Sequence, residues 1–306
     1  MVESPDVMNA RRVLITGAGG YLGGAVVRAL KAAGHQPVAL VRSGGAGFSG
    51  ADDVRVADLL DPDGLRQAVA GVDAVCHLAG LTRARESFDE PVRYYDVNVG
   101  GTIALLEAMD AAGVAGLVFS STCAVYGSPE CQPMTEDLPV DPPHPYASSK
   151  VAAEVAVETQ ARSGALGAVV LRLPNLAGGD DHDPTRLIPR VLAAAMTQTP
   201  LGVNGDGTAV RDYLHVDDAA AAFVAAVERM PEPGGFARYN IGSGRGTSIL
   251  DVVAAVERVT GRRVPLVHNP PAVEPPTLIV DAAKAGAELG WKPRHSEIDA
   301  IIRSIG

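Results

Sequence analysis

The sequence predicts an α/β protein with a doubly wound parallel sheet, followed by a smaller lobe. Over the first 174 residues, short apolar runs alternate with longer segments of helical periodicity. Strands that are buried on both faces are apolar along their whole length, and strand–helix alternation produces right-handed βαβ units. Beyond residue 174, short helical segments are separated by loops rich in glycine and proline. These observations favour a parallel sheet in the first part and an irregular lobe in the second.

Each expected element follows from its apolar pattern and its length. Six strands are buried runs of three to six residues, and they are expected at 13–16, 38–41, 54–56, 74–78, 117–120 and 168–173. The helices have longer periodic patterns, and they are expected at 21–33, 65–70, 91–112, 146–163, 185–196, 216–228, 249–260 and 282–289.

Two domains are expected from this pattern. The first is a dinucleotide-binding domain over 11–174, rejoined by part of 209–241. The second is a substrate-binding lobe over 175–208 and 242–306, which we expect to close over the carboxyl edge of the sheet, where ligands bind in doubly wound folds.

Composition excludes several classes of function. The net charge is −10 and the chain has no block of basic residues, so no nucleic-acid partner is expected. No stretch reaches 18 apolar residues and the first ten contain no apolar run, so neither a membrane span nor a signal peptide is expected. Three scattered cysteines favour a reducing, cytoplasmic location. The cysteines and histidines show no metal-ligand spacing, and no metal is expected.

The segment after the first predicted strand is rich in glycine, with the sequence TGAGGYLG at 16–23. Gly17 permits a tight turn, Gly20 lets the backbone approach a pyrophosphate, and Gly23 lets the next helix pack close to the strand. The N-terminus of that helix offers free N–H groups and a positive dipole end to phosphates. A glycine triplet alone is a weak motif. Its place between a predicted strand and a predicted helix makes it typical of a dinucleotide-binding turn.

The end of the second predicted strand bears on the choice of cofactor. An Asp or Glu here binds the ribose hydroxyls of NAD, whereas this strand ends in Val41, Arg42 and Ser43. A guanidinium at this place can pair with the 2′-phosphate of NADP. NAD is the expected cofactor, and NADP stays open because of Arg42. Asp58, just after the third predicted strand, is a candidate contact to adenine.

Tyr146 and Lys150 form a Tyr-x-x-x-Lys pair at the start of a predicted helix. A spacing of four places both side chains on one helix face, about one turn apart. A tyrosine, with a pKa near 10, is a poor base at neutral pH. A nearby ammonium and the positive nicotinamide both favour the phenolate and lower that pKa. The phenolate can then take a proton from a substrate hydroxyl while hydride leaves the same carbon.

A run of hydroxyl side chains follows the fifth predicted strand, in the segment FSSTCAVYG at 119–127. The carboxyl end of this strand is expected beside the nicotinamide. Thr122 is therefore a candidate to hydrogen-bond the reacting oxygen.

Taken together, these residues resemble the extended short-chain dehydrogenase/reductase family of the NAD-dependent epimerase/dehydratase type. Within it they are most similar to the nucleotide-sugar 4-epimerases of the UDP-glucose/galactose type. The resemblance runs from about residue 12 to 293, and its motifs are more specific for the family than for the substrate. The matching segments are ITGAGGYLG at 15–23, HLAGL at 77–81, YYDVNV at 94–99, PYASSK at 145–150, LRLPNLAG at 171–178, DGTAVRDYLHV at 206–216 and YNIGSG at 239–244.

The resemblance implies roles for individual residues. Tyr146 is the acid/base, Lys150 its partner, which also holds the nicotinamide ribose, and Thr122 the hydrogen bond to substrate. Asn98 orients the backbone of the helix that carries Tyr146. The helices that contain Asn98 and Tyr146 form a four-helix interface in a homodimer. The remaining cofactor contacts that the resemblance implies are Tyr21, Leu22, Leu59, Leu78, Ala79, Gly80, Ser120 and Pro174.

A nucleotide-sugar substrate is also implied by the resemblance, with Asn175 and Arg211 at its diphosphate. Two departures concern this substrate. Relatives have an arginine where this chain has Pro271, and they have an asparagine where it has Arg186. Arg186 either replaces the lost arginine or marks a different substrate. The full set of expected substrate contacts is Thr82, Cys123, Asn175, Arg186, Leu187 and Arg211.

Three functions stay open. The first, and the expected one, is a redox-neutral nucleotide-sugar 4-epimerase that works through a 4-keto intermediate. The second is an NADPH-dependent reductase or a dehydratase-like enzyme on a related sugar, which Arg42 and Pro271 favour. Sugar dehydratases carry Asp-Glu where this chain has Cys123 and Ala124, so dehydration is disfavoured. The third is a non-catalytic dinucleotide sensor, which the presence of Tyr146 disfavours.

Overall fold

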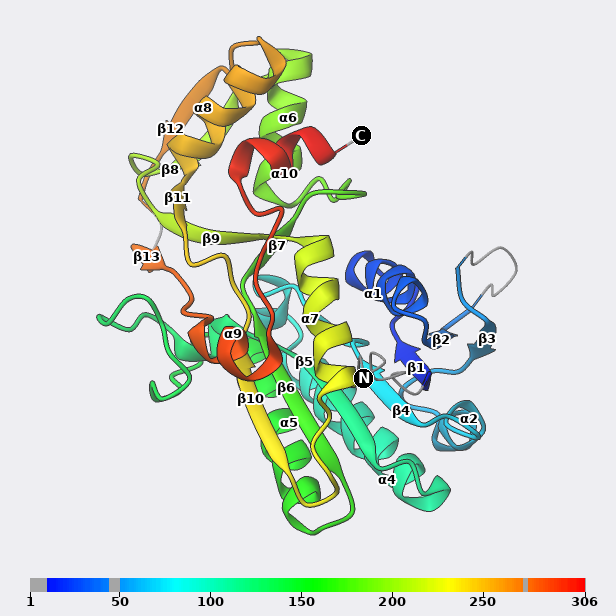
Figure 1. Ribbon diagram of the computed structural model, residues 1–306. Coiled ribbons are helices and arrows are strands. Elements are labelled where there is room, and N and C mark those ends of the chain that lie inside the picture. The colour runs from blue at the N-terminus through cyan, green and yellow to red at the C-terminus, as the bar shows by residue number, and fades with distance from the viewer. Residues whose placement is uncertain (1–9, 44–49, 272–274, 306) are drawn as a thin grey trace, which may run out of the picture. The chain divides into compact units, whose positions relative to one another are not determined.

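A sheet of seven strands organises the N-terminal part of the chain (Figure 1). The computed structural model describes residues 10–43, 50–271 and 275–305. The strands of the sheet are β1 (Arg12–Thr16), β2 (Gln36–Val41), β3 (Asp53–Val56), β4 (Ala74–His77), β5 (Gly116–Thr122), β6 (Gly167–Leu173) and β10 (Phe236–Asn240). Their order is β10-β6-β5-β4-β1-β2-β3, and β1 pairs in parallel with both β2 and β4. The predicted doubly wound parallel sheet is therefore confirmed.

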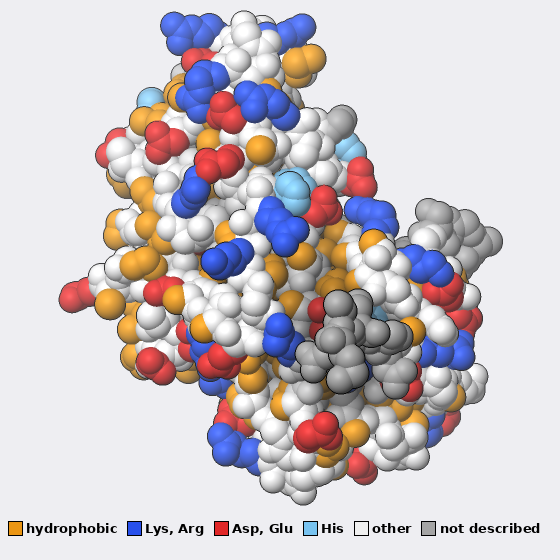
Figure 2. Space-filling view, in the orientation of Figure 1, with side chains coloured by type: hydrophobic (Ala, Val, Ile, Leu, Met, Phe, Trp, Pro, Cys, Tyr) orange, Lys and Arg blue, Asp and Glu red, His pale blue; other side chains and the backbone are white. Residues whose placement is uncertain are grey.

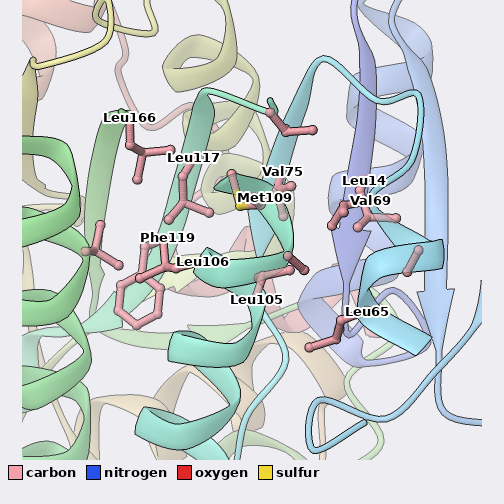
Figure 3. Close-up of a cluster of buried hydrophobic side chains, with 14 of the residues drawn as sticks. Leu14, Leu65, Val69, Val75, Leu105, Leu106, Met109, Leu117, Phe119 and Leu166 are labelled. Atoms are coloured by element: carbon pink, nitrogen blue, oxygen red, sulfur yellow. The ribbon is translucent and has the colours of Figure 1, made fainter. Parts of the chain in front are cut away.

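Helices cover both faces of this sheet. Figure 1 shows α1 (Tyr21–Ala32) and α7 (Val216–Glu228) on one face. The other face is covered by α2 (Pro62–Ala68), α4 (Gly101–Ala112) and α5 (Pro145–Arg162). These three helices share one buried apolar cluster with the sheet (Figure 3). Each large apolar side chain buried there contributes about 1.5–3 kcal/mol. The labelled members of the cluster are Leu14, Leu65, Val69, Val75, Leu105, Leu106, Met109, Leu117, Phe119 and Leu166.

The long helix expected at 91–112 is not regular throughout. In the structure, α3 (Pro91–Tyr95) is followed by the π-helical segment η2 (Asp96–Gly100) and then by α4. The apolar pattern predicted the helical path but not the π-helical turn. Such turns insert one residue into the helical path and are frequent at functional sites. Asn98, at the centre of the turn, is 3% exposed.

The described residues fall into two compact units. The first contains the residues up to Ser121, with His144–Leu171 and Ala220–Arg238. The second contains Thr122–Pro143, Arg172–Ala219 and the residues from Tyr239 onward. The segment Thr122–Pro143 therefore packs with the second unit, although it lies inside the span expected for the dinucleotide-binding domain.

The second unit contains short strands that the sequence did not predict. They are β7 (Asn175–Ala177), β8 (Leu201–Asn204), β9 (Val210–His215), β11 (Gly246–Ser248), β12 (Leu266–Asn269) and β13 (Thr277–Leu278). β9 pairs with β7, β11 and β13, and β8 pairs with β12. Its helices are α6 (Leu187–Thr197), α8 (Ile249–Thr260), α9 (Ala283–Leu289) and α10 (Ile298–Ser304), of which α10 was also not predicted.

The core of the second unit forms between α6, α8 and α10. Ile188 and Val191 of α6, Val252 and Val256 of α8, and Ile301 of α10 are each at most 2% exposed. On the face that Figure 2 shows, basic and acidic side chains are interspersed rather than gathered by sign. In the part of the chain that the structure describes, no helix is long and apolar enough to cross a membrane.

Candidate active site

The glycine-rich turn joins β1 to α1 in the geometry that the sequence predicted. Gly17 has a φ of +71°, and a Cβ on it would lie 2.9 Å from the backbone nitrogen of Ala79. A Cβ on Gly23 would overlap the carbonyl oxygen of Gly17 and approach Ala18 Cα to 2.8 Å. Gly20 begins α1 as its N-cap, without a side-chain cap, and its N–H donates to the carbonyl of Gly17 at 2.9 Å. The turn is therefore closed against the residues that follow β4, and α1 begins after Gly20, which carries no side chain.

A buried network of hydrogen bonds fixes the carboxyl ends of β1 and β4. The hydroxyl oxygen of Thr16 accepts from the N–H groups of Leu78 and Ala79, each at 3.1 Å, and lies 2.7 Å from His77 Nδ1. On the other side of the ring, His77 Nε2 lies 3.0 Å from the hydroxyl of Thr102. The predicted cofactor residues Leu78 and Ala79 are thus held directly beside the glycine turn.

The protonation of His77 follows from its neighbours. The Thr102 hydroxyl donates to the carbonyl of Asn98 at 2.6 Å, so it accepts from His77 Nε2–H. Nδ1 then accepts the proton of the Thr16 hydroxyl. Burial, and next the positive charge of Lys150, lower the pKa of His77 to about 3. The imidazole of His77 is therefore neutral, carries its proton on Nε2 and links Thr16 with Thr102 by hydrogen bonds.

Asn98 connects the end of β4 with α5. Its side-chain oxygen accepts from Leu81 N–H at 2.8 Å, and its amide donates to the Leu81 carbonyl at 3.0 Å and to Ser149 Oγ at 2.9 Å. The Ser149 hydroxyl in turn donates to the carbonyl of Tyr146 at 2.8 Å. A Cβ on Gly80 would lie 2.8 Å from the Asn98 oxygen, so this glycine is required for the approach. Asn98 is therefore tied through Ser149 to the first turn of α5.

Tyr146 lies in the first turn of α5, in contact with two aromatic rings. The ring of Tyr94 meets it edge-on, with centroids 6.4 Å apart and an angle of 73°. The ring of His144 stacks with it at 5.7 Å and 15°. These two contacts define the direction of the phenol.

Lys150 follows one turn later on α5 and is 5% exposed. Its ammonium lies 4.4 Å from the centre of the Phe119 ring. Burial lowers the pKa of Lys150 to about 8, and the carboxylate of Glu154 acts in the opposite direction. Glu154, another turn along, is 1% exposed, accepts a hydrogen bond from the Ser121 hydroxyl and forms an ion pair with Arg238, whose Nε lies 3.1 Å from its carboxylate. α5 thus presents a tyrosine, a lysine and a glutamate at successive turns.

The end of β5 places Ser120 and Thr122 at the carboxyl edge of the sheet. Ser120 is half-buried. Thr122 is the N-cap of η3 (Cys123–Tyr126), and its hydroxyl oxygen accepts from Ala124 N–H at 3.2 Å. The thiol of Cys123 is buried and donates to the carbonyl of Arg172 at 3.2 Å.

The other predicted cofactor residues occupy scattered positions. Arg42 is exposed just beyond β2. Asp58 is exposed, and its carboxylate accepts from Leu60 N–H at 2.9 Å. Leu59 is buried, at the place where a Cβ on Gly101 would approach it to 2.9 Å. Three more are half-buried, namely Tyr21 and Leu22 in the first turn of α1 and Pro174 after β6.

Most of the predicted substrate residues lie in the second unit. Asn175 is the exposed first residue of β7, and Leu187 begins α6. Arg186, the N-cap of α6, pairs with the carboxylate of Asp181 at 3.1 Å. Arg211 lies in β9 and donates to the carbonyl of Val210 at 2.8 Å. Thr82 is exposed in the first unit, after β4, and Cys123 is the buried thiol of η3.

Comparison with known proteins identifies the family in which this arrangement occurs. The model of the NAD dependent epimerase/dehydratase family matches residues 13–242.

The chain belongs to the NAD dependent epimerase/dehydratase family.

Relatives match over nearly the whole length. The UDP-glucose 4-epimerase of Streptomyces lividans is 39% identical over 95% of this chain and 94% of its own. The crystal structure of UDP-glucose 4-epimerase from Brucella ovis in complex with NAD is 36% identical, with a TM-score of 0.91, and 97% of each chain is covered. The UDP-glucose-4-epimerase of Stenotrophomonas maltophila, with bound NAD and formylated UDP-arabinopyranose, is 32% identical, with a TM-score of 0.90 and 96% of each chain covered.

The sequence analysis did not predict the positions of several residues of the candidate site. The position of His77, which links Thr16 at the end of β1 with Thr102 of α4, was not predicted. His144 directly precedes the Pro-Tyr of the motif, and this spacing was the signal for an N-cap. Glu154 lies four residues after Lys150, which places it on the same helix face. Arg238 carried no local signal, because it comes from a strand 84 residues further along the chain. Within the described residues, no group of His, Cys, Asp and Glu can hold a metal ion.

Proposed function

We propose that the chain is a nucleotide-sugar 4-epimerase that interconverts UDP-glucose and UDP-galactose. The observation that carries this proposal is the first part of α5. There, Tyr146 and the buried Lys150 stand one turn apart, and hydrogen bonds through Ser149 and Asn98 tie them to the end of β4. The names of the relatives support the substrate class.

NAD is the proposed cofactor. The glycine turn fits a dinucleotide pyrophosphate, since Gly17 and Gly23 leave no room for side chains and the N-terminus of α1, with the positive end of its dipole, lies at Gly20. NAD is bound in the two solved relatives. NADP should be tested as an alternative cofactor, because Arg42 stands just beyond β2, where a guanidinium can pair with a 2′-phosphate. We also propose that the first unit binds the cofactor and that residues of the second bind the substrate.

The proposed mechanism assigns proton movement to α5. When bound, the nicotinamide supplies the hydride acceptor and later returns the same hydride, so there is no net oxidation. Tyr146, as phenolate, takes the proton of the sugar 4-hydroxyl and gives it back after the 4-keto sugar has turned over. Lys150 favours the phenolate only while its ammonium is protonated. Thr122 is proposed to hydrogen-bond the reacting oxygen.

Substrate binding is proposed to rely on the second unit. Asn175 and Arg211 are the proposed contacts to the diphosphate. Arg186 is proposed to supply the positive charge that Pro271 does not, although Asp181 already offsets part of that charge. Thr82, Cys123 and Leu187 complete the proposed set.

A homodimer is proposed as the assembled form. Apolar side chains are exposed on the helices that the resemblance assigns to the interface. On α3 and α4 these are Val92 (70% exposed), Tyr95 (42%) and Ile103 (43%), and on α5 Val155 (57%). Exposed apolar side chains on neighbouring helices are typical of an interface. Light scattering after size exclusion tests this, and a monomer at micromolar concentration would contradict it. The free cysteines favour a cytoplasmic location.

The experiment that tests the function supplies UDP-galactose to the purified protein and follows UDP-glucose by chromatography. We expect conversion to an equilibrium mixture with at most catalytic amounts of added NAD, and no lasting absorbance of reduced nicotinamide. Tyr146→Phe should lower kcat by about 10²–10⁴-fold, because the general base is removed. Stoichiometric consumption of NADPH would instead establish a reductase and refute the proposal.

A further inference from the structure

The first turn of α5 is capped by an unusual residue. Helix N-caps are most often Ser, Thr, Asp or Asn, whose short side chains accept a hydrogen bond from the first turn. In this chain the N-cap is His144, with extended backbone (φ −155°, ψ 159°), and its Nδ1 accepts from Ala147 N–H at 3.1 Å. A ring nitrogen accepts only when it carries no proton. The cap therefore exists only while His144 is neutral, with its proton on Nε2.

The same imidazole contacts the tyrosine of the motif. Its ring stacks with that of Tyr146 at 5.7 Å and 15°, and the ring of Phe88, from η1 (Glu86–Phe88), meets its edge at 6.3 Å and 81°. Tyr146 is also contacted by Tyr94 of α3. One side chain thus caps the turn that carries Tyr146 and also packs against the Tyr146 ring.

We propose that His144 is a positioning residue for Tyr146, and that it holds the tyrosine and its helical turn in place only while the imidazole is neutral. This inference rests on the proposed role of Tyr146 as the acid/base. It makes the geometry of the site sensitive to acid through a residue outside the proposed set of substrate contacts.

Protonation opposes this geometry in two ways. A proton on Nδ1 would face the N–H of Ala147, so that two donors would meet. The positive ring would also lie at the positive end of the α5 dipole. In agreement, burial lowers the pKa of His144 below its ordinary value of 6.5.

The charged groups near His144 do not reverse this lowering of its pKa. Two ion pairs lie at the elements packed against His144. Arg83 pairs with Glu86 at 4.0 Å, and Arg93 pairs with Glu90 at 2.6 Å. The titratable and charged groups of these elements are Tyr146, Lys150, Glu154, Glu158 and Arg162 on α5, Glu86 on η1 with Arg83, Arg85 and Asp89 at its flanks, and Arg93, Tyr94 and Tyr95 on α3 with Glu90 and Asp96 at its flanks.

The sign of the linkage follows from the lowered pKa. The unfolded chain binds a proton at His144 near pH 6.5, and the folded chain binds it only at lower pH. The stability that the neutral imidazole provides is therefore fully present above about pH 6.5 and is lost as the pH falls through the folded pKa.

Two matched variants separate the cap from the ring. His144→Asn keeps an N-cap acceptor that does not titrate in this range and removes the ring. His144→Phe keeps a ring and removes the acceptor. At pH 8 we expect each variant to lower kcat by about two- to tenfold, with the KM for UDP-galactose within about twofold of wild type, because each retains one of two positioning contacts.

The pH dependence is the decisive readout. Between pH 8 and 5.5 the wild-type protein should lose about 2–4 °C more in Tm than His144→Asn, and its kcat should fall more steeply. The other six histidines are present in both proteins, so the difference isolates His144. His144→Ser, a second short cap, should behave like His144→Asn.

Parallel losses of Tm and kcat in wild type and both short-cap variants would overturn the proposal. So would wild-type kcat at pH 8 in both His144→Asn and His144→Phe. The melting comparison concerns the cap alone, whereas full activity of Tyr146→Phe would refute the proposed function. The two failures are therefore distinguishable.

Discussion

Glu154 is expected to set the pH range in which Lys150 supports catalysis. Its carboxylate is buried one helical turn beyond Lys150 and raises the pKa of that lysine against the effect of burial, which lowers it to about 8. Glu154→Gln removes this charge. The glutamine still accepts from the Ser121 hydroxyl, and Arg238 keeps its bond to Glu158 at 3.1 Å. The variant therefore changes charge with little change in shape.

The size of the effect follows from the spacing. Two charges about 6 Å apart, one helical turn, interact by about 3 kcal/mol at an effective dielectric constant of about 20. Arg238 and Ser121 already offset part of the charge of Glu154. We therefore expect about half of this energy, which lowers the pKa of Lys150 by about one unit.

The assay is the pH profile of kcat for UDP-galactose epimerisation. In the wild-type protein, kcat should fall as the pH rises through about 8, where Lys150 loses its proton. In Glu154→Gln this fall should begin about one pH unit lower, so that kcat is about threefold lower at pH 7.5 and almost unchanged at pH 6.

Glu158→Gln is the matched control. Glu158 lies on the same helix and also pairs with Arg238, but it is not among the groups that shift the pKa of Lys150. Its pH profile should match that of wild type. An unmoved profile in Glu154→Gln, a shift to higher pH, or an equal shift in Glu158→Gln would refute the reasoning.

Three further predictions concern the two binding regions. Gly23→Ala should lower the free energy of unfolding by about 1–3 kcal/mol and weaken NAD binding, because its Cβ would overlap the Gly17 carbonyl. In the control variant Gly24→Ala the nearest atom to the new Cβ is 3.6 Å away, so its melting temperature and NAD titration should match wild type. Arg42→Ala should weaken NADP by about tenfold or more, from the loss of a charge-assisted bond, while NAD changes little, and equal losses in fluorescence titrations would contradict a role at the 2′-phosphate. Arg211→Ala should raise the KM for UDP-galactose by about tenfold or more without changing NAD affinity, and an unaltered KM would exclude the proposed diphosphate contact.

The sequence by itself determined the first six strands of the large sheet and most of the helices. Buried parallel strands are apolar along their length, and helices repeat with a period of 3.6, so both leave local patterns. The glycine turn was also determined locally, because only glycine tolerates the φ of +71° at position 17 and the close approach at 23. Tyr146 and Lys150 were found because their spacing of four places them on one helix face.

The second unit was decided by tertiary structure. Strands of two to six residues, such as β13 and β7, carry too little periodicity to be recognised. Their pairing is not local, since β8 finds its partner β12 more than 60 residues away. For this reason the sequence showed only the helices there, and it missed α10.

The details of the candidate site also depended on the fold. The hydrogen bonds of Asn98 to Leu81 and Ser149, the two hydrogen bonds that fix the tautomer of His77, and the pairing of Glu154 with Arg238 join residues that are distant in the chain. A sequence shows which residues can donate, accept or carry charge. Which of them meet depends on how strands pair and helices pack, and burial in that packing is what moves the pKa values of His77 and Lys150.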